Sequence, residues 1–175
     1  MPLSSIFNDK GLKPKEKTEQ ISKLIVDNTL SQTDLVAFAK KAKEPMKATC
    51  IESLEFATQS NPALLTTETL HFVINSLQDK SPRIKWESAK VIGNTIHLFP
   101  GEIEHAVGKL LINTEDGGTV VRWSAAFALA KIIKLKAEIN NHLVPAAEAI
   151  ITREEKNSIK KIYLEALKKV KVVKK

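Results

Sequence analysis

The sequence predicts an all-α protein, a right-handed α-solenoid of about four helix pairs with a capping helix at its N-terminal end. Two observations predict this class. Apolar residues recur at three- and four-residue steps, as on one face of a helix, and the whole pattern returns after 37 or 38 residues. A period of this length is typical of stacked helical units. Strand-like alternation never lasts more than a few residues, so we expect no β-sheet.

The clearest unit is the stretch Asp116–Leu135, DGGTVVRWSAAFALAKIIKL. Asp116 and the two glycines predict a turn, and a helix follows whose apolar residues share one face. These residues are Val121, Ala125, Ala128, Leu129, Ile132 and Ile133. Because several of them are small, we expect this face to lie close to a neighbouring helix.

A basic residue marks the same place in four copies of the unit, as Lys47, Lys85, Arg122 and Lys160. Apolar columns accompany it. One residue earlier stand Met46, Ile84, Val121 and Ile159, and seven residues later stand Leu54, Ile92, Leu129 and Leu167. Six residues before the basic column stand Asp79, Asp116 and Glu154, although Lys41 breaks this pattern in the first copy.

The segments 79–85 and 116–122, DKSPRIK and DGGTVVR, resemble the signature of the HEAT repeat family. The resemblance covers roughly residues 31–171. It implies paired antiparallel helices, with the second helix of each pair on a concave surface. It also implies that the basic column, Lys47, Lys85, Arg122 and Lys160, bonds to turn acids and holds adjacent repeats in register, and Asp79, Asp116 and Glu154 are present to accept these bonds. The signature is specific for architecture and nearly silent on activity.

Turn and cap signals predict the elements in order. We expect an irregular lead-in over residues 1–14, then a helix over residues 15–28 that caps the stack, because terminal repeats are usually atypical. Ser31 is a helix N-cap, and the prolines at positions 45 and 82 suit a first helical turn. The later helices are expected over residues 45–58, 64–77, 82–98, 102–113, 119–135, 139–151 and 154–170. With a basic tail over residues 171–175, the chain 1–175 is expected to form a single domain.

The excess of positive charge lies at the C-terminal end. The formal net charge is +7, and residues 156–175 carry eight lysines against one acid, Glu165, whereas the rest of the chain is balanced. Lysines near a helix C-terminus are favoured by the macrodipole, and charge runs are commonly solvated faces. The alternative is an arm that contacts phosphates or an acidic partner.

Several classes of protein and site are not indicated. No apolar run approaches the ~18 residues of a membrane span, and the N-terminus lacks signal-peptide character, so we expect a cytoplasmic protein without membrane association. Cys50, the single cysteine, is expected to be a small buried hydrophobe. The histidines have no metal-ligand spacing, and no Gly-rich phosphate loop or Ser/His/Asp arrangement is evident. We therefore expect no metal, no cofactor and no catalytic residues.

Trp86 and Trp123 directly follow the basic column, one repeat apart. On a helical projection Trp86 falls about 200° from Ile84, away from the main apolar stripe. We expect Trp86, Lys90, Trp123 and Lys131 to form a binding site on the concave face, where rings and lysines contact bases, sugars or a partner's side chains. The alternative is that both tryptophans fill a groove between neighbouring helices.

The first interpretation of function is a non-enzymatic binding module whose concave face recognises a protein partner by shape and charge. The alternative is a nucleic-acid-binding protein that resembles the HEAT-like DNA glycosylases for alkylated bases, which use an acid near concave aromatic residues. Here the residues one turn after the tryptophans are Lys90 and Phe127, which are not acids. Glu87 is adjacent to Trp86 but points about 100° away from it, so base excision is not expected. An accessory or lyase role for a chromophore-bearing or metabolic protein is a third possibility that no residue favours. The partner's identity and the oligomeric state stay open.

Overall fold

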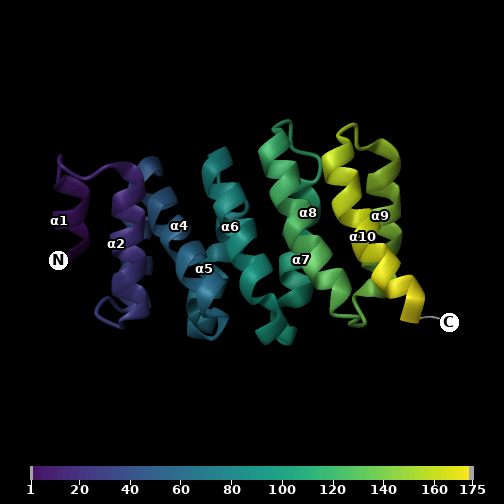
Figure 1. The fold of residues 1–175 in the computed structure, drawn as a ribbon, viewed down its shortest axis with the longest axis horizontal. Coiled ribbons are helices and arrows are strands. Elements are labelled where there is room, and N and C mark those ends of the chain that lie inside the picture. Colours follow the sequence, from purple (N-terminus) through teal and green to yellow (C-terminus); the bar gives the residue numbers. More distant parts are fainter. Residues whose placement is uncertain (1, 174–175) are drawn as a thin grey trace.

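The computed structural model describes residues 2–173, and side chains are described for residues 2–170. Within residues 2–173 the chain forms α-helices joined by turns and short 3-10 segments, with no strand. Figure 1 shows these helices standing side by side in a row, with the N-terminus at one end and the C-terminus at the other. The prediction of an all-α solenoid is confirmed.

Four helix pairs form the body of the solenoid. They are α3 (Gln32–Lys41) with α4 (Glu44–Ser60), α5 (Thr67–Ser76) with α6 (Pro82–Thr95), α7 (Ile103–Asn113) with α8 (Thr119–Lys134), and α9 (Asn140–Arg153) with α10 (Asn157–Val173). Short 3-10 segments cover Pro62–Leu64, Ile96–Leu98 and Pro100–Glu102. The segment Ile96–Leu98 replaces the end of the helix that we expected over residues 82–98. Leu64 and Glu102, the expected first residues of the helices over 64–77 and 102–113, instead end the other two 3-10 segments.

The helices form two layers. The second helices of the pairs (α4, α6, α8 and α10) contact one another in succession along their length, and the contacts between the first helices (α3, α5, α7 and α9) are much sparser. Helices on the inside of a curved stack stand closer together than those on the outside. This difference places the second helices in the inner, concave layer, and we call their solvent-facing surface the concave face.

Side-chain caps explain where several helices begin. The hydroxyl oxygens of Ser31, Thr66 and Ser81 each accept a hydrogen bond from the backbone N–H three residues later, at 3.1, 3.2 and 3.3 Å. Each bond satisfies a donor that has no partner within the helix. Pro82 follows Ser81 directly, where the missing N–H of proline has no consequence.

The apolar columns form the core between the layers. Ile84, Ile92, Val121 and Leu129 are at most 1% exposed, and Ala126 is fully buried. Burying one large aliphatic side chain contributes about 1.5–3 kcal/mol, so the repeating columns supply much of the stability. Cys50 is also fully buried, as expected, and burial raises the pKa of its thiol to about 12. Such a thiol is chemically inert at neutral pH.

The N-terminal cap differs from the expectation. Residues 2–8, which we expected to be irregular, form helix α1 (Pro2–Asn8), and α1 packs on α2 (Pro14–Val26). Leu3 is fully buried, and the ring of Phe7 stacks on Phe38 with the centroids 5.4 Å apart. A helix of seven residues has little stability of its own. These tertiary contacts hold it, and local sequence patterns do not report them.

At the other end, α10 runs to Val173. The side chains of the expected basic tail, residues 171–175, lie outside the described residues. None of the helices within residues 2–173 has both the length and the apolar character that are needed to cross a bilayer.

Candidate functional site

A ladder of ion pairs runs along one edge of the concave layer. In each step a basic-column residue contacts the turn acid of the following repeat. The pairs are Lys47 Nζ with Asp79 Oδ2 at 3.0 Å, Lys85 Nζ with Asp116 Oδ2 at 3.0 Å, and Arg122 Nε with Glu154 Oε2 at 3.1 Å. Lys160 occupies the same column in the last repeat, and it forms no ion pair among the described residues.

Arg122 makes the most bonds in this ladder. Its Nη2 donates to Glu154 Oε1 at 3.3 Å, and its Nη1 donates to the backbone carbonyls of Asp116 and Gly117 at 3.1 and 3.3 Å. The planar guanidinium allows this forked bonding, which a lysine cannot provide. The side chain therefore fixes both its own turn and the next one, and this is a structural role.

The turn acids are adapted to remain ionised. Partial burial alone would raise the pKa values of Asp79, Asp116 and Glu154. Backbone N–H donors in the turns and the basic partners outweigh this effect, so all three pKa values lie below their ordinary range. Hydrogen bonding to the charged form of a carboxyl is the usual cause of such a decrease.

A second charged cluster lies between α4 and α6. Glu55 and Glu87 are each 2% exposed. Lys90 Nζ is 3.3 Å from Glu87 Oε1 and 3.7 Å from Glu55 Oε1. One ammonium thus faces two carboxylates, and burial raises the pKa of Glu87, with further contributions from Lys90, which lowers it, and Glu52, which raises it. The charge of Lys90 is already compensated within the protein.

The other basic residue near this point is compensated too. Arg83 Nη2 is 3.0 Å from Glu52 Oε2. Both basic residues, Arg83 and Lys90, are therefore paired with acids in the α4–α6 part of the concave face.

An aromatic stack occupies the concave side of α8. The rings of Trp123 and Phe127 are nearly parallel, with centroids 5.8 Å apart, and Lys131 Nζ lies 5.6 Å from the Phe127 centroid. The three residues are spaced by four along the helix, so they form one line. Trp123 is 37% exposed. Offset-stacked rings and a cation over a ring face are both attractive arrangements.

Gly93 of α6 makes room for this stack. A Cβ at position 93 would lie 2.6 Å from Cε1 of Phe127. Because real Cβ atoms essentially never approach so closely, glycine allows the Phe127 ring to lie directly on the α6 backbone. The sequence did not reveal this contact, because Gly93 and Phe127 belong to different repeats.

Beside the stack is a pocket of about 400 Å³. It lies among the C-terminal ends of α4, α6 and α8, where Gln59, Asn94, His97, Lys131 and Lys134 provide its polar lining. Lys134 is half-buried. Burial, Lys169 and Lys131 lower the pKa of Lys134, against an opposing effect of Glu165.

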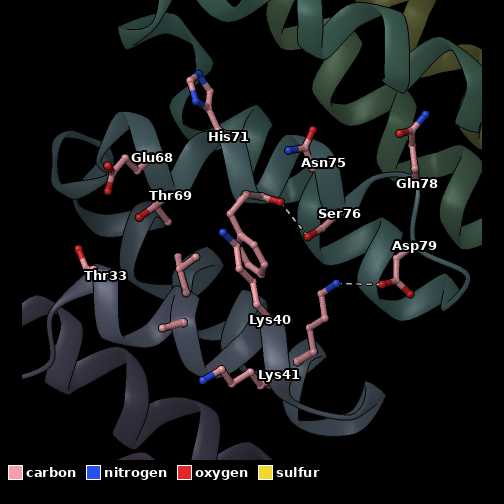
Figure 2. Close-up of a pocket in the computed structure, with 14 residues that line it drawn as sticks. Thr33, Lys40, Lys41, Glu68, Thr69, His71, Asn75, Ser76, Gln78 and Asp79 are labelled. Atoms are coloured by element: carbon pink, nitrogen blue, oxygen red, sulfur yellow. Dashed lines mark hydrogen bonds and ion pairs between the residues drawn. The ribbon is translucent and has the colours of Figure 1, made fainter.

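A wider pocket, with a volume of about 830 Å³, opens on the first-helix layer. It is lined mainly by α3 and α5, with Val36, Ala37 and Phe72 as apolar residues, and also by Lys47 of α4 and the turn at Asp79. Figure 2 shows Lys41 and His71 on opposite sides of it, with Asp79 at a third side. Two lysines of its lining, Lys40 and Lys41, are solvent-exposed.

This outer pocket lies in the gap between α3 and α5, which differs from the other gaps of the first-helix layer in the side chains that cross it. In the gap between α5 and α7, Lys109 Nζ donates to Asn75 Oδ1 at 3.1 Å and to Gln78 Oε1 at 2.9 Å. In the gap between α7 and α9, Arg153 Nη2 donates to Thr114 Oγ1 at 2.8 Å. Phe72 stands where the repeat places Lys109, so no long basic side chain fills the α3–α5 gap in this way.

The structure brings only part of the expected site together. Trp123 and Lys131 lie on one face with Phe127, and Trp86 is half-buried on the neighbouring helix. Neither tryptophan belongs to the buried core cluster of the described residues. Lys90 is engaged by Glu55 and Glu87 instead of facing a ligand freely.

The binding site expected from the sequence did not include Phe127, Lys134 or Gly93. Phe127 and Lys134 had an available signal, because Trp123, Phe127, Lys131 and Lys134 follow helical spacing on one face. The role of Gly93 depends on a contact between repeats and had no local signal.

Comparison with known proteins supports the architecture. No protein-family model and no curated protein matches the chain. A designed armadillo repeat protein, YIII(Dq.V1)4CPAF in complex with the peptide (KR)4, matches with a TM-score of 0.70 and 22% identity over 87% of this chain and 68% of that one.

Two further structures are similar. The complex of CpcE and CpcF of phycocyanin lyase from Nostoc sp. PCC7120 matches with a TM-score of 0.70 and 15% identity, over 94% of this chain and 97% of that one. Computationally designed armadillo repeat proteins for modular peptide recognition match with a TM-score of 0.73 and 16% identity, over 96% and 80% of the two chains. At these identities the likeness concerns the fold. The chain is an α-solenoid of the armadillo and HEAT-like repeat architecture.

Proposed function

We propose that this protein is a non-enzymatic binding module that holds an extended segment of a protein partner against its concave face. The Trp123–Phe127 stack on α8 carries this proposal. Trp123 is 37% exposed, whereas Val121 and Leu129 on the same helix are at most 1% exposed. A large ring left in water at this position gains free energy when a partner covers it.

The rings are also held in place before a partner arrives. Phe127 rests on Gly93, and Trp123 rests on Phe127. A rigid aromatic residue loses little conformational entropy on binding, which is why Trp and Tyr dominate the energetics of interfaces. A partner's apolar side chain would lie against this platform, with Trp86 on the neighbouring helix at its margin.

The charges of the concave face favour a protein partner over a nucleic acid. Binding of a phosphate backbone needs a continuous basic path. On α6, however, Arg83 is paired with Glu52, and Lys90 is held by two carboxylates. A nucleic-acid chain that crossed α4 and α6 would meet compensated charges there.

The buried acids support a role without catalysis. Glu87, the acid next to Trp86, is 2% exposed, so it does not face the surface where a flipped base would lie. A general acid or base must reach the proton that it transfers. The glycosylase alternative therefore has no acid in position at Trp86.

The structural neighbours agree with this proposal at the level of shape. Two of the similar structures are designed armadillo repeat proteins, one in complex with the peptide (KR)4 and the other designed for modular peptide recognition. A shared fold offers a similar layered surface, but ligands belong to sites and not to folds. The support for this chain comes from its own exposed aromatic residues.

A selection of short random peptides displayed on phage tests the proposal. Enriched peptides are synthesised with a fluorescent label, and their affinities are measured by anisotropy against the wild type, Trp123→Ala and Trp86→Ala. We expect both variants to keep the wild-type circular dichroism and to bind at least about tenfold more weakly, the usual size of an aromatic hot spot.

Ile112→Ala is the matched control, because Ile112 is a large apolar side chain, 59% exposed, on the first-helix layer. Equal losses in Trp123→Ala and Ile112→Ala would contradict a site on the concave face. Unfolding of both tryptophan variants would show that the rings serve the core.

A further inference from the structure

The concave face of α8 changes character along the helix. Trp123 and Phe127 provide two rings, and Lys131 and Lys134 follow on the same side at the C-terminal end. Both lysines line the 400 Å³ pocket beside the stack. An aromatic platform therefore leads directly into a pocket with two ammonium groups.

The positive charge at this pocket is not neutralised by nearby acids. No acid occurs in α8, and none occurs between Lys90 and Phe99 on the α6 side. Glu55 of α4 is engaged by Lys90 and by the side-chain amide of Gln59. Lys131 and Lys134 form no ion pair among the described residues.

The neighbouring helix α10 adds positive charge as well. Burial lowers the pKa of Lys134, and the charges of Lys169 and Lys131 lower it further. The one acid that opposes them, Glu165, also lies 4.0 Å from Lys161. Lys131 and Lys134 line the pocket, and Lys169 adds positive charge from the neighbouring helix.

Helix dipoles reduce this charge but do not cancel it. The C-terminal end of a helix carries roughly half a negative elementary charge. By that measure the ends of α4, α6 and α8 at the pocket together offset about half of the charge of Lys131, Lys134 and Lys169, and Glu165, which also contacts Lys161, offsets a further part. The remaining excess is positive, and it is concentrated in a hollow instead of being spread over a convex surface.

We propose that the pocket lined by Lys131 and Lys134 binds an anionic side chain of the peptide segment, adjacent to an apolar residue that covers Trp123 and Phe127. This inference rests on the proposed function, and it adds the chemistry of the partner, which is an acidic segment. Charge complementarity selects the occupant. The anionic group is a carboxylate or a phosphate on the peptide, both of which accept hydrogen bonds from ammonium groups.

The test uses peptides enriched on the full-length chain. We expect them to combine an apolar or aromatic residue with nearby acidic residues. The double variant Lys131→Gln/Lys134→Gln should weaken their binding at least about tenfold, since charge-assisted hydrogen bonds are lost. Replacing the peptide's acids by their amides should have a similar effect, and raising the salt concentration should weaken only the wild-type complex strongly.

A control variant at the outer pocket and a charge-reversal variant at the proposed pocket complete the test. Lys40→Gln/Lys41→Gln removes two lysines from the outer pocket, and it should leave the affinity unchanged. Lys131→Glu/Lys134→Glu should abolish binding of acidic peptides. If that reversal disturbs the end of α8, the glutamine variant, whose melting temperature is checked in parallel, still decides the question.

The outcomes separate this inference from the proposed function. Enriched peptides that depend on Trp123 but are neutral or basic, and that ignore the lysine variants, would overturn the acidic-partner inference and leave the binding module standing. No enrichment, or enrichment that ignores both tryptophans, would contradict both. A single-stranded oligonucleotide that outcompetes the peptides through the same lysines would overturn the inference in favour of nucleic acid. Versions with phosphoserine in place of an acid, and competition by inorganic phosphate, distinguish phosphate from carboxylate.

Discussion

Individual residues divide between structural and binding roles according to what they contact. Arg122 and Trp123 are neighbours in sequence, but Arg122 reaches the next turn and Trp123 faces solvent. The sequence placed both in register with their counterparts one repeat earlier. Only the contacts distinguish the two roles.

Removal of Arg122 should cost stability more than binding. Glu154, its partner, is 6% exposed, and truncation would remove both guanidinium bonds to this carboxylate, which would keep only backbone donors such as the Lys156 N–H. We expect Arg122→Ala to lose about 2 kcal/mol of unfolding free energy, measured by urea denaturation. The affinity for a selected peptide should be nearly unchanged, and an unchanged melting temperature would contradict the assigned role in the ladder.

Glu87→Gln should stabilise the protein near neutral pH. Burial raises the pKa of Glu87 above its unfolded value, so its contribution is most favourable below the unfolded pKa and is lost as the pH rises through the folded pKa. Glutamine removes this loss, while Glu55 still pairs with Lys90. We expect the melting temperature of the variant to exceed that of the wild type at pH 7–8, with a difference that shrinks toward about pH 4. If the variant is less stable than the wild type at both pH values, the Glu87–Lys90 bond contributes more than burial of the Glu87 carboxylate costs.

At the scale of elements, the close approach of α6 and α8 determines the shape of the aromatic platform. Gly93 and Phe127 contribute this contact from different repeats. Helix boundaries with strong local signals, such as Ser31 and Ser81, could be predicted from the sequence. Helix α1 could not, because Leu3 and Phe7 gain their stability from contacts with other helices.

Two glycine substitutions test this packing. Gly93→Ala should displace the half-buried ring of Phe127 and disturb its stacking on Trp123, which near-ultraviolet circular dichroism detects, and it should weaken peptide binding. Gly108→Ala is the control, since nothing lies within 4 Å of a Cβ at that position of α7. The control should gain about 0.5–1 kcal/mol of stability from helix propensity and keep the wild-type spectrum. Identical spectra for both variants would contradict the assigned contact.

At the scale of the whole molecule, the ladder couples the four pairs into one stack. The pKa values of Asp79, Asp116 and Glu154 are all lowered. Their contribution to stability is therefore present above the unfolded pKa values, near 4, and is lost as the pH falls through the folded values.

Acid should consequently weaken the solenoid as a unit. We expect the melting temperature of the wild type to fall steeply below about pH 4. Asp116→Asn should be less stable than the wild type at pH 7, and the gap should narrow in acid because the variant has one fewer carboxylate to protonate. A gap that widens in acid would contradict the low pKa assigned to Asp116.

The repeat made the architecture predictable, because the basic and apolar columns recur four times in the printed sequence. The binding surface was less predictable. Helical position put Trp86 away from the apolar stripe but left open whether either tryptophan ring is exposed, and the compensation of Lys90 depends on Glu55 from the preceding repeat. Sequence spacing describes one helix face, and it does not report what a neighbouring repeat places against that face.

Amide hydrogen exchange of the protein with and without a selected peptide would show which layer of the solenoid the peptide covers. We predict that a saturating peptide slows exchange in α6 and α8, near Trp86 and Trp123, and leaves α3 and α5 around the outer pocket unchanged. If exchange slows only in α3 and α5 and is unchanged in α8, the peptide binds the first-helix layer, and the proposed site on the concave face is wrong.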